Sequence, residues 1–404
     1  MIQAAVMGFG TVGAGVVDIL ESNQAQICRA VPEGIHVKYI LDIRDFPDSP
    51  YADRVVHDIN IILDDPEIKI VCETMGGKEP ARTFTSRALE RGISVCTSNK
   101  ELVAAFGPQL LKTAKEHQCS YMFEASVGGG IPLISPLLEC LSQEEITSII
   151  GILNGTTNYI LTKMERQGAD FATVLKEAQD LGYAERNPAA DVEGHDAGRK
   201  IAILSSLVCG KTVAYEDVLV EGITKITPED FRYANKLDYT IKLLGLSEKN
   251  EDGLTVMVSP FMVRTDHPLC AANDVFNAIM LHGTMVDDVM FYGRGAGKLP
   301  TGSAVVADII HEAKLIGKTF PITWEEEKLE LADPKARNAK FFIRLDAAQK
   351  VAAEQILAGS ISEIIVLDGL EEEFALLTDP MTEKAFYEKT ASLTGIRSIL
   401  RVYG

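Results

Sequence analysis

The chain has 404 residues, of which 46% are apolar and 24% are charged, so it can bury more than one core and has the composition of a globular protein. Its 39 Lys and Arg residues against 58 Asp and Glu residues give a formal net charge of −19. That balance argues against a sequence-independent grip on nucleic acid phosphates and against binding to an anionic membrane surface. A local basic pocket for a small substrate stays open.

None of the seven cysteines forms a Cys-x-x-Cys pair, and most lie in apolar runs. This usage favours free buried thiols over disulfides or a zinc site. The first residues form a strand-like run and lack the basic region and cleavage site of a signal peptide. No apolar stretch is long and charge-free enough to span a bilayer. We therefore expect a cytoplasmic protein.

The first motif follows directly on an apolar run, Ile2–Met7, that predicts a buried strand. It is the glycine pattern Gly8-Phe9-Gly10-Thr11-Val12-Gly13, and a helical pattern continues from it. A strand, this pattern and a helix in succession indicate dinucleotide binding. Gly8 permits the tight turn, Gly10 lets the backbone approach a pyrophosphate, and Gly13 lets the helix pack on the strand. The first helical residues, Thr11 and Val12, supply N–H donors to the phosphates.

The second strand is predicted at Ile35–Leu41, which requires an insertion around residues 22–34 because the usual spacing is shorter. Asp42 follows this strand and suits the ribose hydroxyls of NAD. Arg44 instead suits the extra phosphate of NADP. Asp42 favours NAD and Arg44 favours NADP, so the prediction is NAD(P). For either residue alone, a place in an ordinary solvated loop is the alternative.

Strands and helices alternate through residue 124, which favours a mostly parallel sheet covered on both faces. Ligands of such sheets bind beyond the carboxyl ends of the strands. The corners at Met75–Gly77 and Ser98–Lys100 fall there, so Asn99 and Lys100 are expected beside the cofactor. The predicted elements are strands Lys69–Thr74, Ile93–Thr97 and Ser120–Glu124 and helices Glu79–Arg91 and Lys100–Glu116.

Two glycine-rich segments follow. The first, EASVGGGIPLISPL from Glu124, exposes main-chain carbonyls that suit either a hard cation or a hinge, and the hinge is favoured on physical grounds alone. The second, residues 292–302, precedes a predicted helix at Ser303–Ile316 that returns to the first domain and brings Gly297 against the cofactor. Between them, Gly151–Tyr159 carries hydroxyls and amides suited to a polar pocket.

A charged, irregular segment, LGYAERNPAADVEGHDAGRK, runs into the apolar IAILSSLVCG. A helix is expected to start at Asp191 or Glu193, which places Asp196 and Lys200 on one face. Such a pair is commonly a surface ion pair worth a few tenths of a kcal/mol, and spacing alone favours that interpretation. The alternative is a catalytic lysine held at the edge of a core.

Seven segments in order resemble homoserine dehydrogenases over nearly the whole chain. They are GFGTVG, MGGKEPA, SNKELVA, FEASVGGGIP, GILNGTTNYIL, LGYAERNPAADVEGHDAGRK and YGRGAGKLPTGSAVVADI. The resemblance implies NAD(P)-dependent interconversion of L-homoserine and L-aspartate 4-semialdehyde.

The resemblance also implies the roles of individual residues. Lys200 matches the general acid/base lysine and Lys100 the second catalytic lysine. Arg186 and Asn187 depart from the more acidic residues often found in the family, and the family pattern gives His195 no role. Substrate binding falls to Glu185, Asp191 and Asp196, and a monovalent cation such as Na⁺ to main-chain oxygens of Glu124, Val127, Gly129 and Ile131.

After Pro321 the composition changes, and Trp324–Arg337 has the charge of a linker. The tail then predicts a β-α-β-β-α-β order, which is ferredoxin-like and resembles an ACT domain. Such a domain implies an amino acid effector, here threonine, whereas a plain dimerisation module is the alternative. The resemblance further implies a homodimer or homotetramer.

The expected fold is α/β with three domains. They are a Rossmann-type dinucleotide-binding domain (1–130 plus 297–320), an α+β catalytic and dimerisation domain (131–296) and an ACT-like C-terminal domain (338–404). Two rival functions are an oxidoreductase acting on another small amino or keto acid and an amino-acid-responsive regulator that binds NAD(P) without catalysis. The presence of both lysines, Lys100 and Lys200, weakens the regulator, and the lack of a basic, aromatic-interleaved stripe disfavours nucleic acid as a partner.

Overall fold

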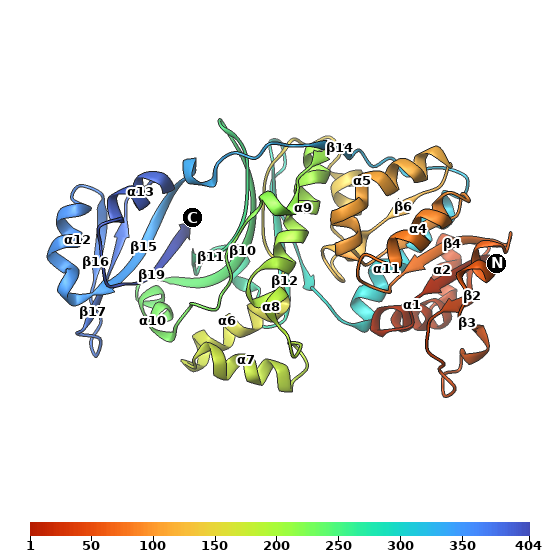
Figure 1. The fold of residues 1–404 in the computed structure, drawn as a ribbon, viewed down its shortest axis with the longest axis horizontal. Helices are drawn as coiled ribbons and strands as arrows, with labels where there is room; N and C mark the ends of the chain where they lie inside the picture. Colours follow the sequence, from red (N-terminus) through yellow and green to blue (C-terminus); the bar gives the residue numbers. More distant parts are fainter. The chain divides into compact units, whose positions relative to one another are not determined.

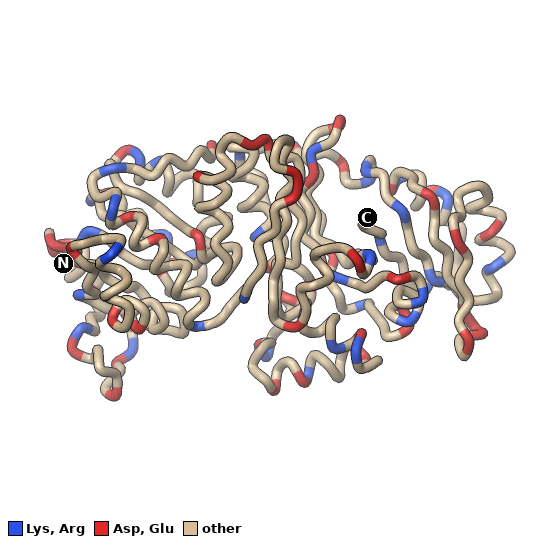
Figure 2. Tube along the Cα trace, turned by 180° about the vertical axis from the view of Figure 1, so that it is seen from behind, with Lys and Arg blue, Asp and Glu red and all other residues tan.

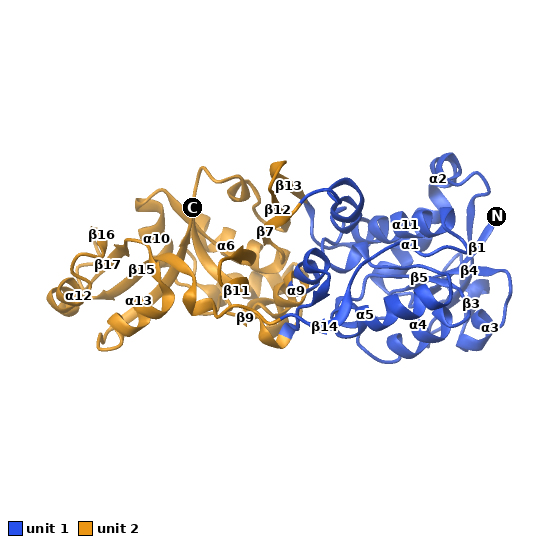
Figure 3. Cartoon of the chain, turned by 90° about the horizontal axis from the view of Figure 1, so that it is seen from above, with its two compact units in different colours: residues 1–144, 202–215, 293–329 blue, residues 145–201, 216–292, 330–404 orange.

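The computed structural model describes residues 1–404 and divides into two compact units (Figure 3). Unit 1 comprises residues 1–144, 202–215 and 293–329, and unit 2 comprises residues 145–201, 216–292 and 330–404. Lys and Arg positions are interspersed with Asp and Glu positions along the chain (Figure 2). The longest apolar helices all fall short of what crossing a membrane would require.

Unit 1 is built on a six-stranded sheet in the order β3-β2-β1-β4-β5-β6, with every pair parallel (Figure 1). This is the strand order of the dinucleotide-binding fold that the glycine motif predicts. The strands are β1 (Ile2–Met7), β2 (Ile35–Leu41), β3 (Val55–Val56), β4 (Ile68–Glu73), β5 (Ser94–Thr97) and β6 (Tyr121–Met122). Its helices are α1 (Thr11–Ser22), α2 (Gln24–Ala30), α3 (Ile59–Leu63), α4 (Ala81–Leu89), α5 (Lys100–Glu116) and α11 (Lys298–Lys314).

Two of these helices explain features of the sequence. Helix α2 fills the insertion that the long spacing between the glycine motif and β2 requires. Helix α11 begins five residues before the expected Ser303, at Lys298, and packs against α1. The contact is close enough that a Cβ on Gly15 would lie 2.3 Å from the Lys298 carbonyl oxygen, so only glycine fits there.

Unit 2 is built on a mixed sheet whose centre is the long antiparallel hairpin β10 (Tyr239–Asn250) and β11 (Gly253–Arg264). Helices α6 and α10 pack against β10, which is buried along most of its length. Around this hairpin lie β7 (Ile146–Ile152), β9 (Leu219–Val220), β12 (Phe276–Gly283) and β13 (Asp287–Arg294). The helices of this part are α6 (Gly155–Gln167), α7 (Phe171–Asp180), α8 (Ala189–Val192) and α10 (Pro228–Lys236), and α9 (His195–Cys209) begins here and ends in unit 1.

The tail has the expected β-α-β-β-α-β order, and its sheet runs β19-β15-β17-β16 with antiparallel neighbours. The rings of Phe341 and Phe386 stack in its core, 4.1 Å apart. Strand β19 also pairs in parallel with β11, so the tail's sheet continues that of unit 2. Its elements are β15 (Asn338–Asp346), α12 (Lys350–Ile356), β16 (Ile361–Ile365), β17 (Glu373–Thr378), β18 (Met381–Thr382), α13 (Glu383–Thr390) and β19 (Ile396–Tyr403).

The structure differs from the expected boundaries for physical reasons. Residues 338–404 fall within unit 2 because β19 joins β11. Residues 131–144 fall within unit 1. The segment expected to be a linker contains β14 (Glu325–Lys328), which pairs with β8 (Lys211–Thr212). Trp324 is buried there beside Gly107, and its indole N–H donates to Thr212 Oγ1.

Candidate active site

The glycine motif forms a tight cradle at the carboxyl end of β1. Gly8 has a φ of +95°, and a Cβ on Gly13 would lie 1.9 Å from the Gly8 carbonyl oxygen. Around Gly10 the same construction meets no atom within 4 Å, so the backbone there is open to a ligand. Helix α1 begins at Thr11, and its first N–H groups, including that of Val12, supply the donors and positive potential that a pyrophosphate needs.

Asp42 stands at the end of β2, buried, with its carboxylate fully engaged. One oxygen accepts from the Arg44 N–H and Nε, and the other from the Phe9 N–H and Arg44 Nη2, at 2.8–3.0 Å. Burial alone would raise the pKa of Asp42, but the hydrogen bonds from Arg44 and Phe9 lower it to about 2. Asp42 is therefore ionised, and Arg44 shields it.

Two corners at the ends of β4 and β5 are tied together. Glu73, the last residue of β4, is fully buried and accepts from Thr97 Oγ1 at 2.6 Å and from the Met75 N–H at 2.7 Å. Asn99 caps α5 through the Leu102 N–H and donates to the Gly77 carbonyl at 2.6 Å. These bonds place Asn99 and Lys100, the first residue of α5, at the sheet edge where the cofactor prediction puts them.

Sequence analysis gave Glu73 no role, although an acid that ends a buried strand is a signal. A buried carboxyl group requires hydrogen-bond partners because it is polar and ionisable, and the turn at Met75 and Gly76 supplies two of them. Burial raises the pKa of Glu73 against the opposing hydrogen bonds from Thr97 and Met75.

The glycine-rich loop after β6 packs within unit 1 against residues 295–300. A Cβ on Gly129 would lie 2.2 Å from the Gly295 carbonyl oxygen, and the Gly130 N–H donates to the Arg294 carbonyl. Gly297, with a φ of +126°, precedes α11 in the same packing.

In this loop the Glu124 side chain accepts hydrogen bonds from main-chain N–H groups. Its carboxylate accepts from the N–H groups of Leu133, Ile134 and Ser135 at 2.6–2.7 Å. Val127 and Ile131 are buried in the same loop, where the Ile131 N–H donates to the Gly128 carbonyl. The four residues to which the sequence assigned a cation, Glu124, Val127, Gly129 and Ile131, thus lie in one loop of unit 1.

In unit 2 the ion pair of Asp196 and Lys200 is buried on α9. Lys200 Nζ lies 2.8 Å from Asp196 Oδ2 and donates to the Leu153 carbonyl at 2.8 Å. Lys200 is 7% exposed and Asp196 is 3% exposed, so the surface-pair interpretation is wrong. The pairing has the i,i+4 spacing that the sequence predicted.

Asn154 joins this pair to a second acid. Its amide nitrogen donates to Asp191 Oδ1 and to Asp196 Oδ2, both at 2.8 Å, while its carbonyl oxygen caps α6 through the Thr157 N–H. Both amide protons and the amide oxygen are therefore used. Burial and the neighbouring Asp196 raise the pKa of Asp191. The Asn-Gly-Thr-Thr pattern before an apolar run is the N-cap signal that would have identified Asn154.

Other expectations for this segment need correction. The helix does not start at Asp191 or Glu193: α8 ends at Val192, Gly194 takes a φ of +86°, and α9 starts at His195. A Cβ on Gly194 would lie 3.0 Å from Val220 Cγ1, so the break is packed in place. The Glu185 side chain is exposed, and the structure shows no hydrogen bond between it and Lys200, Asp191 or Asp196.

We define the Lys200 cluster as Lys200, Asp196, Asn154, Asp191 and the Leu153 carbonyl. An ammonium group offers three donors, and this cluster engages two of those of Lys200. The third N–H donor suits an oxygen of a bound molecule. A lysine that contacts a reacting oxygen in this way can act as a general acid or base. The two oriented carboxylates suit a cation such as an α-ammonium group.

Two family models match the chain. The model described as "Homoserine dehydrogenase" matches residues 132–310. The model described as "Homoserine dehydrogenase, NAD binding domain" matches residues 8–124. The chain is 38% identical over 371 residues to the homoserine dehydrogenase of Bacillus subtilis, covering 90% of this chain and 85% of that one.

Solved structures agree. The homoserine dehydrogenase of Thiobacillus denitrificans superposes with a TM-score of 0.91 at 34% identity, covering 100% of this chain and 98% of that one. A hyperthermophilic archaeal homoserine dehydrogenase in complex with NADPH superposes with a TM-score of 0.65 at 26% identity, covering 80% of this chain and 99% of that one.

Proposed function

The chain belongs to the homoserine dehydrogenase family, and from this premise we propose that the Lys200 cluster is its catalytic centre. The family interconverts L-homoserine and L-aspartate 4-semialdehyde with NAD(P), within amino acid biosynthesis leading to threonine, methionine and isoleucine. The observation that carries the proposal is the buried Lys200 ammonium, held by Asp196 and the Leu153 carbonyl, with one donor left for substrate oxygen.

Lys200 exchanges the proton of the reacting oxygen. In oxidation the neutral amine takes the hydroxyl proton of homoserine, and in reduction the ammonium returns it to the aldehyde oxygen. Asp196 and the Leu153 carbonyl fix the direction of Nζ, because both accept from it at 2.8 Å. The dinucleotide, when bound, accepts or donates the hydride.

Asp191 and Asp196 bind the substrate's α-ammonium group. Asn154 orients both carboxylates through its amide protons, and carboxylate oxygens suit the protons of an ammonium group. Glu185 is assigned to the same role through its match to the family motif; the exposure of its loop is compatible with contact to an arriving substrate.

The cofactor is NAD(P), bound by the edge of the unit 1 sheet. Gly8, Gly10, Thr11, Val12 and Gly13 receive the pyrophosphate. Arg44 faces the adenosine ribose, and the NADPH bound to the archaeal relative supports NADP as a cofactor. Asn99, Lys100 and Gly297 complete the site, with Lys100 as the second catalytic lysine.

A monovalent cation such as Na⁺ is assigned to the main-chain oxygens of Glu124, Val127, Gly129 and Ile131. The support is chemical: three N–H groups hold the Glu124 carboxylate against the backbone, and the main-chain carbonyl oxygens of this loop are hard donors of the kind that such a cation prefers.

The tail, residues 338–404, is assigned as an ACT-like regulatory domain that binds threonine. Its sheet order β19-β15-β17-β16 supports the ferredoxin-like assignment. A homodimer or homotetramer is proposed from the family resemblance. A cytoplasmic location is proposed because all seven cysteines are free thiols.

The test is oxidation of L-homoserine by the dialysed protein with NAD⁺ or NADP⁺, followed by the absorbance of the reduced nicotinamide, with and without threonine. We expect turnover that depends on homoserine, stimulation by Na⁺ or K⁺ over a bulky organic cation, and inhibition by threonine. Cofactor binding without turnover on homoserine would contradict the catalytic assignment. Turnover unaffected by threonine would contradict the regulatory role of the tail alone.

A further inference from the structure

A cavity of about 400 Å³ lies at the carboxyl edge of the unit 1 sheet, beside the glycine cradle. Its walls include Gly8 and Gly10 from the cradle, Asp42 and Arg44 after β2, His57 after β3, and Thr74 after β4. Because β3 neighbours β2 in the sheet, His57 and Arg44 come from adjacent strand ends. His57 is the one cavity residue with a titratable side chain near neutrality to which no role has been assigned.

The charge state of His57 follows from its partners. Nδ1 lies 2.7 Å from the Asp42 carbonyl oxygen and Nε2 lies 3.1 Å from Asp45 Oδ1. A carbonyl and an ionised carboxylate can only accept, so both ring nitrogens must donate. Both contacts therefore favour the imidazolium form of His57. The hydrogen bond to the Asp42 carbonyl, followed by the contact with Asp45, raises the pKa of His57 against the opposing effect of burial.

The charged groups facing His57 are Asp42, Arg44 and Asp45, all in the segment that follows β2. The residues lining the cavity from the β4 side, Thr74 and Phe84 among them, carry no charge. Arg44 neutralises the Asp42 carboxylate and takes up all four of its acceptor positions together with the Phe9 N–H. The ribose hydroxyls of a bound dinucleotide would therefore meet two cations, and Asp42 could accept from those hydroxyls only if Arg44 withdrew.

We propose that Arg44 and the imidazolium of His57 together bind the 2′-phosphate of NADP, so that the preference for NADP over NAD declines as the solution becomes more alkaline. The proposal rests on the dinucleotide-binding function and names the group that sets its cofactor choice. Arg44 supplies a charge that persists at every working pH, because guanidinium stays protonated. His57 supplies the part that titrates: its Nε2 proton transfers its hydrogen bond from Asp45 to a phosphate oxygen.

The experiment measures dissociation constants of NADP⁺ and NAD⁺ by calorimetric titration, without turnover, from about pH 6 to about pH 9. The proteins are the wild type, His57→Gln and the control His117→Gln, an exposed histidine at the end of α5. The 2′-phosphate itself titrates with a pKa of about 6, so the wild-type preference is divided by that of His57→Gln at each pH to cancel this contribution.

We expect the NADP preference of wild type, divided by that of His57→Gln, to fall by on the order of tenfold as His57 loses its proton. The corresponding ratio of wild type to His117→Gln should stay constant over the same pH range. NAD⁺ affinity is expected to be unchanged in His57→Gln, which shows that the variant is folded. Asp45→Asn removes a contact that raises the pKa of His57, so it should move the midpoint of the decline to lower pH.

A quotient that stays at one value over the whole range would overturn the role of His57 while leaving dinucleotide binding intact. A midpoint unmoved by Asp45→Asn would assign the titration to another group. Failure of both dinucleotides to bind at any pH would overturn the inference together with the proposed function.

Discussion

At the scale of single residues, the proposed site residues of each unit carry the charge that their proposed ligand requires. Unit 1 presents N–H groups and the Arg44 guanidinium to an anionic cofactor. Unit 2 presents Asp191 and Asp196 for an ammonium and Lys200 for an oxygen. An overall charge of −19 is therefore compatible with binding an anionic cofactor.

Asn154 should matter for catalysis beyond its capping of α6. In Asn154→Ser the hydroxyl keeps an N-cap acceptor, so the loss of unfolding free energy, about 1–3 kcal/mol, should come from the two carboxylates left without their donor. The shorter side chain cannot hold Asp191 and Asp196 together, and we expect kcat/KM for homoserine to fall roughly 10- to 100-fold with cofactor affinity unchanged. Steady-state kinetics against Asn187→Ser, an exposed asparagine just before α8, measures this; equal kinetics in both variants would refute it.

Glu312 on α11 should control how stability varies with pH. It is fully buried, neither carboxylate oxygen has a hydrogen-bond partner, and burial followed by Asp308 raises its pKa well above the ordinary value. The native state thus keeps a proton that the unfolded state has lost. Stability therefore falls as pH rises from the unfolded pKa toward the raised folded one, by up to about 1.4 kcal/mol per pH unit.

Glu312→Gln removes this loss. In denaturant unfolding, the variant should be more stable than wild type at about pH 8. Its advantage in unfolding free energy over wild type should be smaller at about pH 5. The exposed control Glu90→Gln should keep the wild-type slope. A wild-type slope in Glu312→Gln as well would show that the Glu312 carboxyl is not the titrating group.

At the scale of secondary-structure elements, the bounds predicted from the sequence agree with the structure where local residues determine them. Ile2–Met7 and Ile35–Leu41 were predicted with the bounds of β1 and β2, because both are short segments rich in apolar and β-branched residues and are closed by glycine or a charge. The break at Gly194 was missed, because its cause is a tertiary contact with Val220. Local sequence does not reveal such contacts.

The central hairpin of unit 2 shows the same limit. Strand β10 is buried on both faces, so its sequence, YTIKLLGLSEKN, lacks the alternation that identifies a half-exposed strand. The site residues of α9 were predictable because i,i+4 spacing is local. The links from Lys200 to Leu153 and from Asn154 to Asp191 join residues far apart in the chain, which the spacing cannot indicate.

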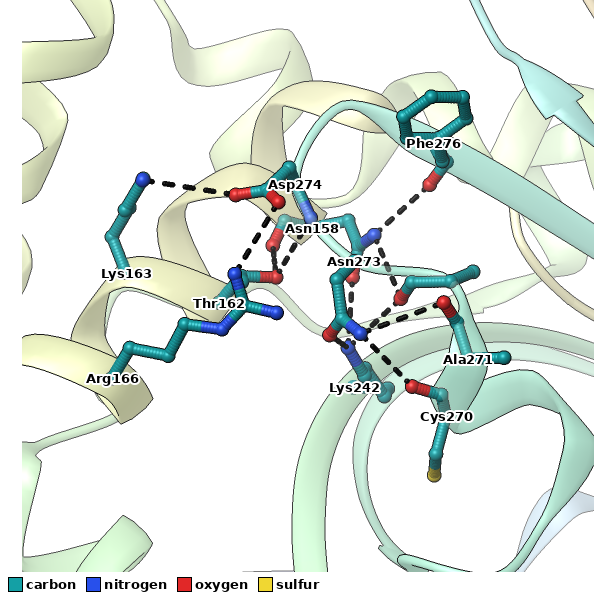
Figure 4. A network of polar contacts seen from close by, with 11 residues as sticks. Asn158, Thr162, Lys163, Arg166, Lys242, Cys270, Ala271, Asn273, Asp274 and Phe276 are labelled. Atoms are coloured by element: carbon teal, nitrogen blue, oxygen red, sulfur yellow. Dashed lines mark hydrogen bonds and ion pairs between the residues drawn. The ribbon is translucent and has the colours of Figure 1, made fainter.

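Lys242 on β10 anchors α6, the helix that Asn154 caps (Figure 4). Its buried Nζ donates to the carbonyl oxygens of Asn158 and Asn273 side chains and to the Ala272 main chain at 3.0–3.3 Å. Asn158 in turn donates to the carbonyls of Ala272 and Phe276. Burial lowers the pKa of Lys242. Wild-type stability should therefore rise with pH from that lowered pKa toward the ordinary lysine value.

Lys242→Met leaves these buried acceptors without their donor. We expect a loss of about 1–3 kcal/mol in unfolding free energy, and faster amide hydrogen exchange along α6 than elsewhere in unit 2. Lys163→Met is the control, because Lys163 lies on the same helix and only approaches Asp274 at 3.8 Å. Equal losses in the two variants would remove Lys242 from this role.

At the scale of the whole molecule, each unit has its own sheet and its own part of the chemistry. The parallel order β3-β2-β1-β4-β5-β6 gathers the cofactor residues at one edge of unit 1. In unit 2 the tail continues the sheet through β19 and β11. Arg401 on β19 reinforces that junction through Glu383, Glu221 and Ser259. The tail is thus connected to the sheet beside α9 by backbone hydrogen bonds between β19 and β11 and by the buried Arg401.

The most direct test of the catalytic assignment is the turnover of Lys200→Met on L-homoserine, with cofactor affinity measured on the same sample. Lys176→Met is the matched control, an exposed lysine whose partner Asp180 has the same i,i+4 spacing. The account predicts that kcat falls by at least about 10²-fold in Lys200→Met, with the dissociation constant of the dinucleotide and the activity of the control unchanged. Normal turnover by Lys200→Met would contradict it.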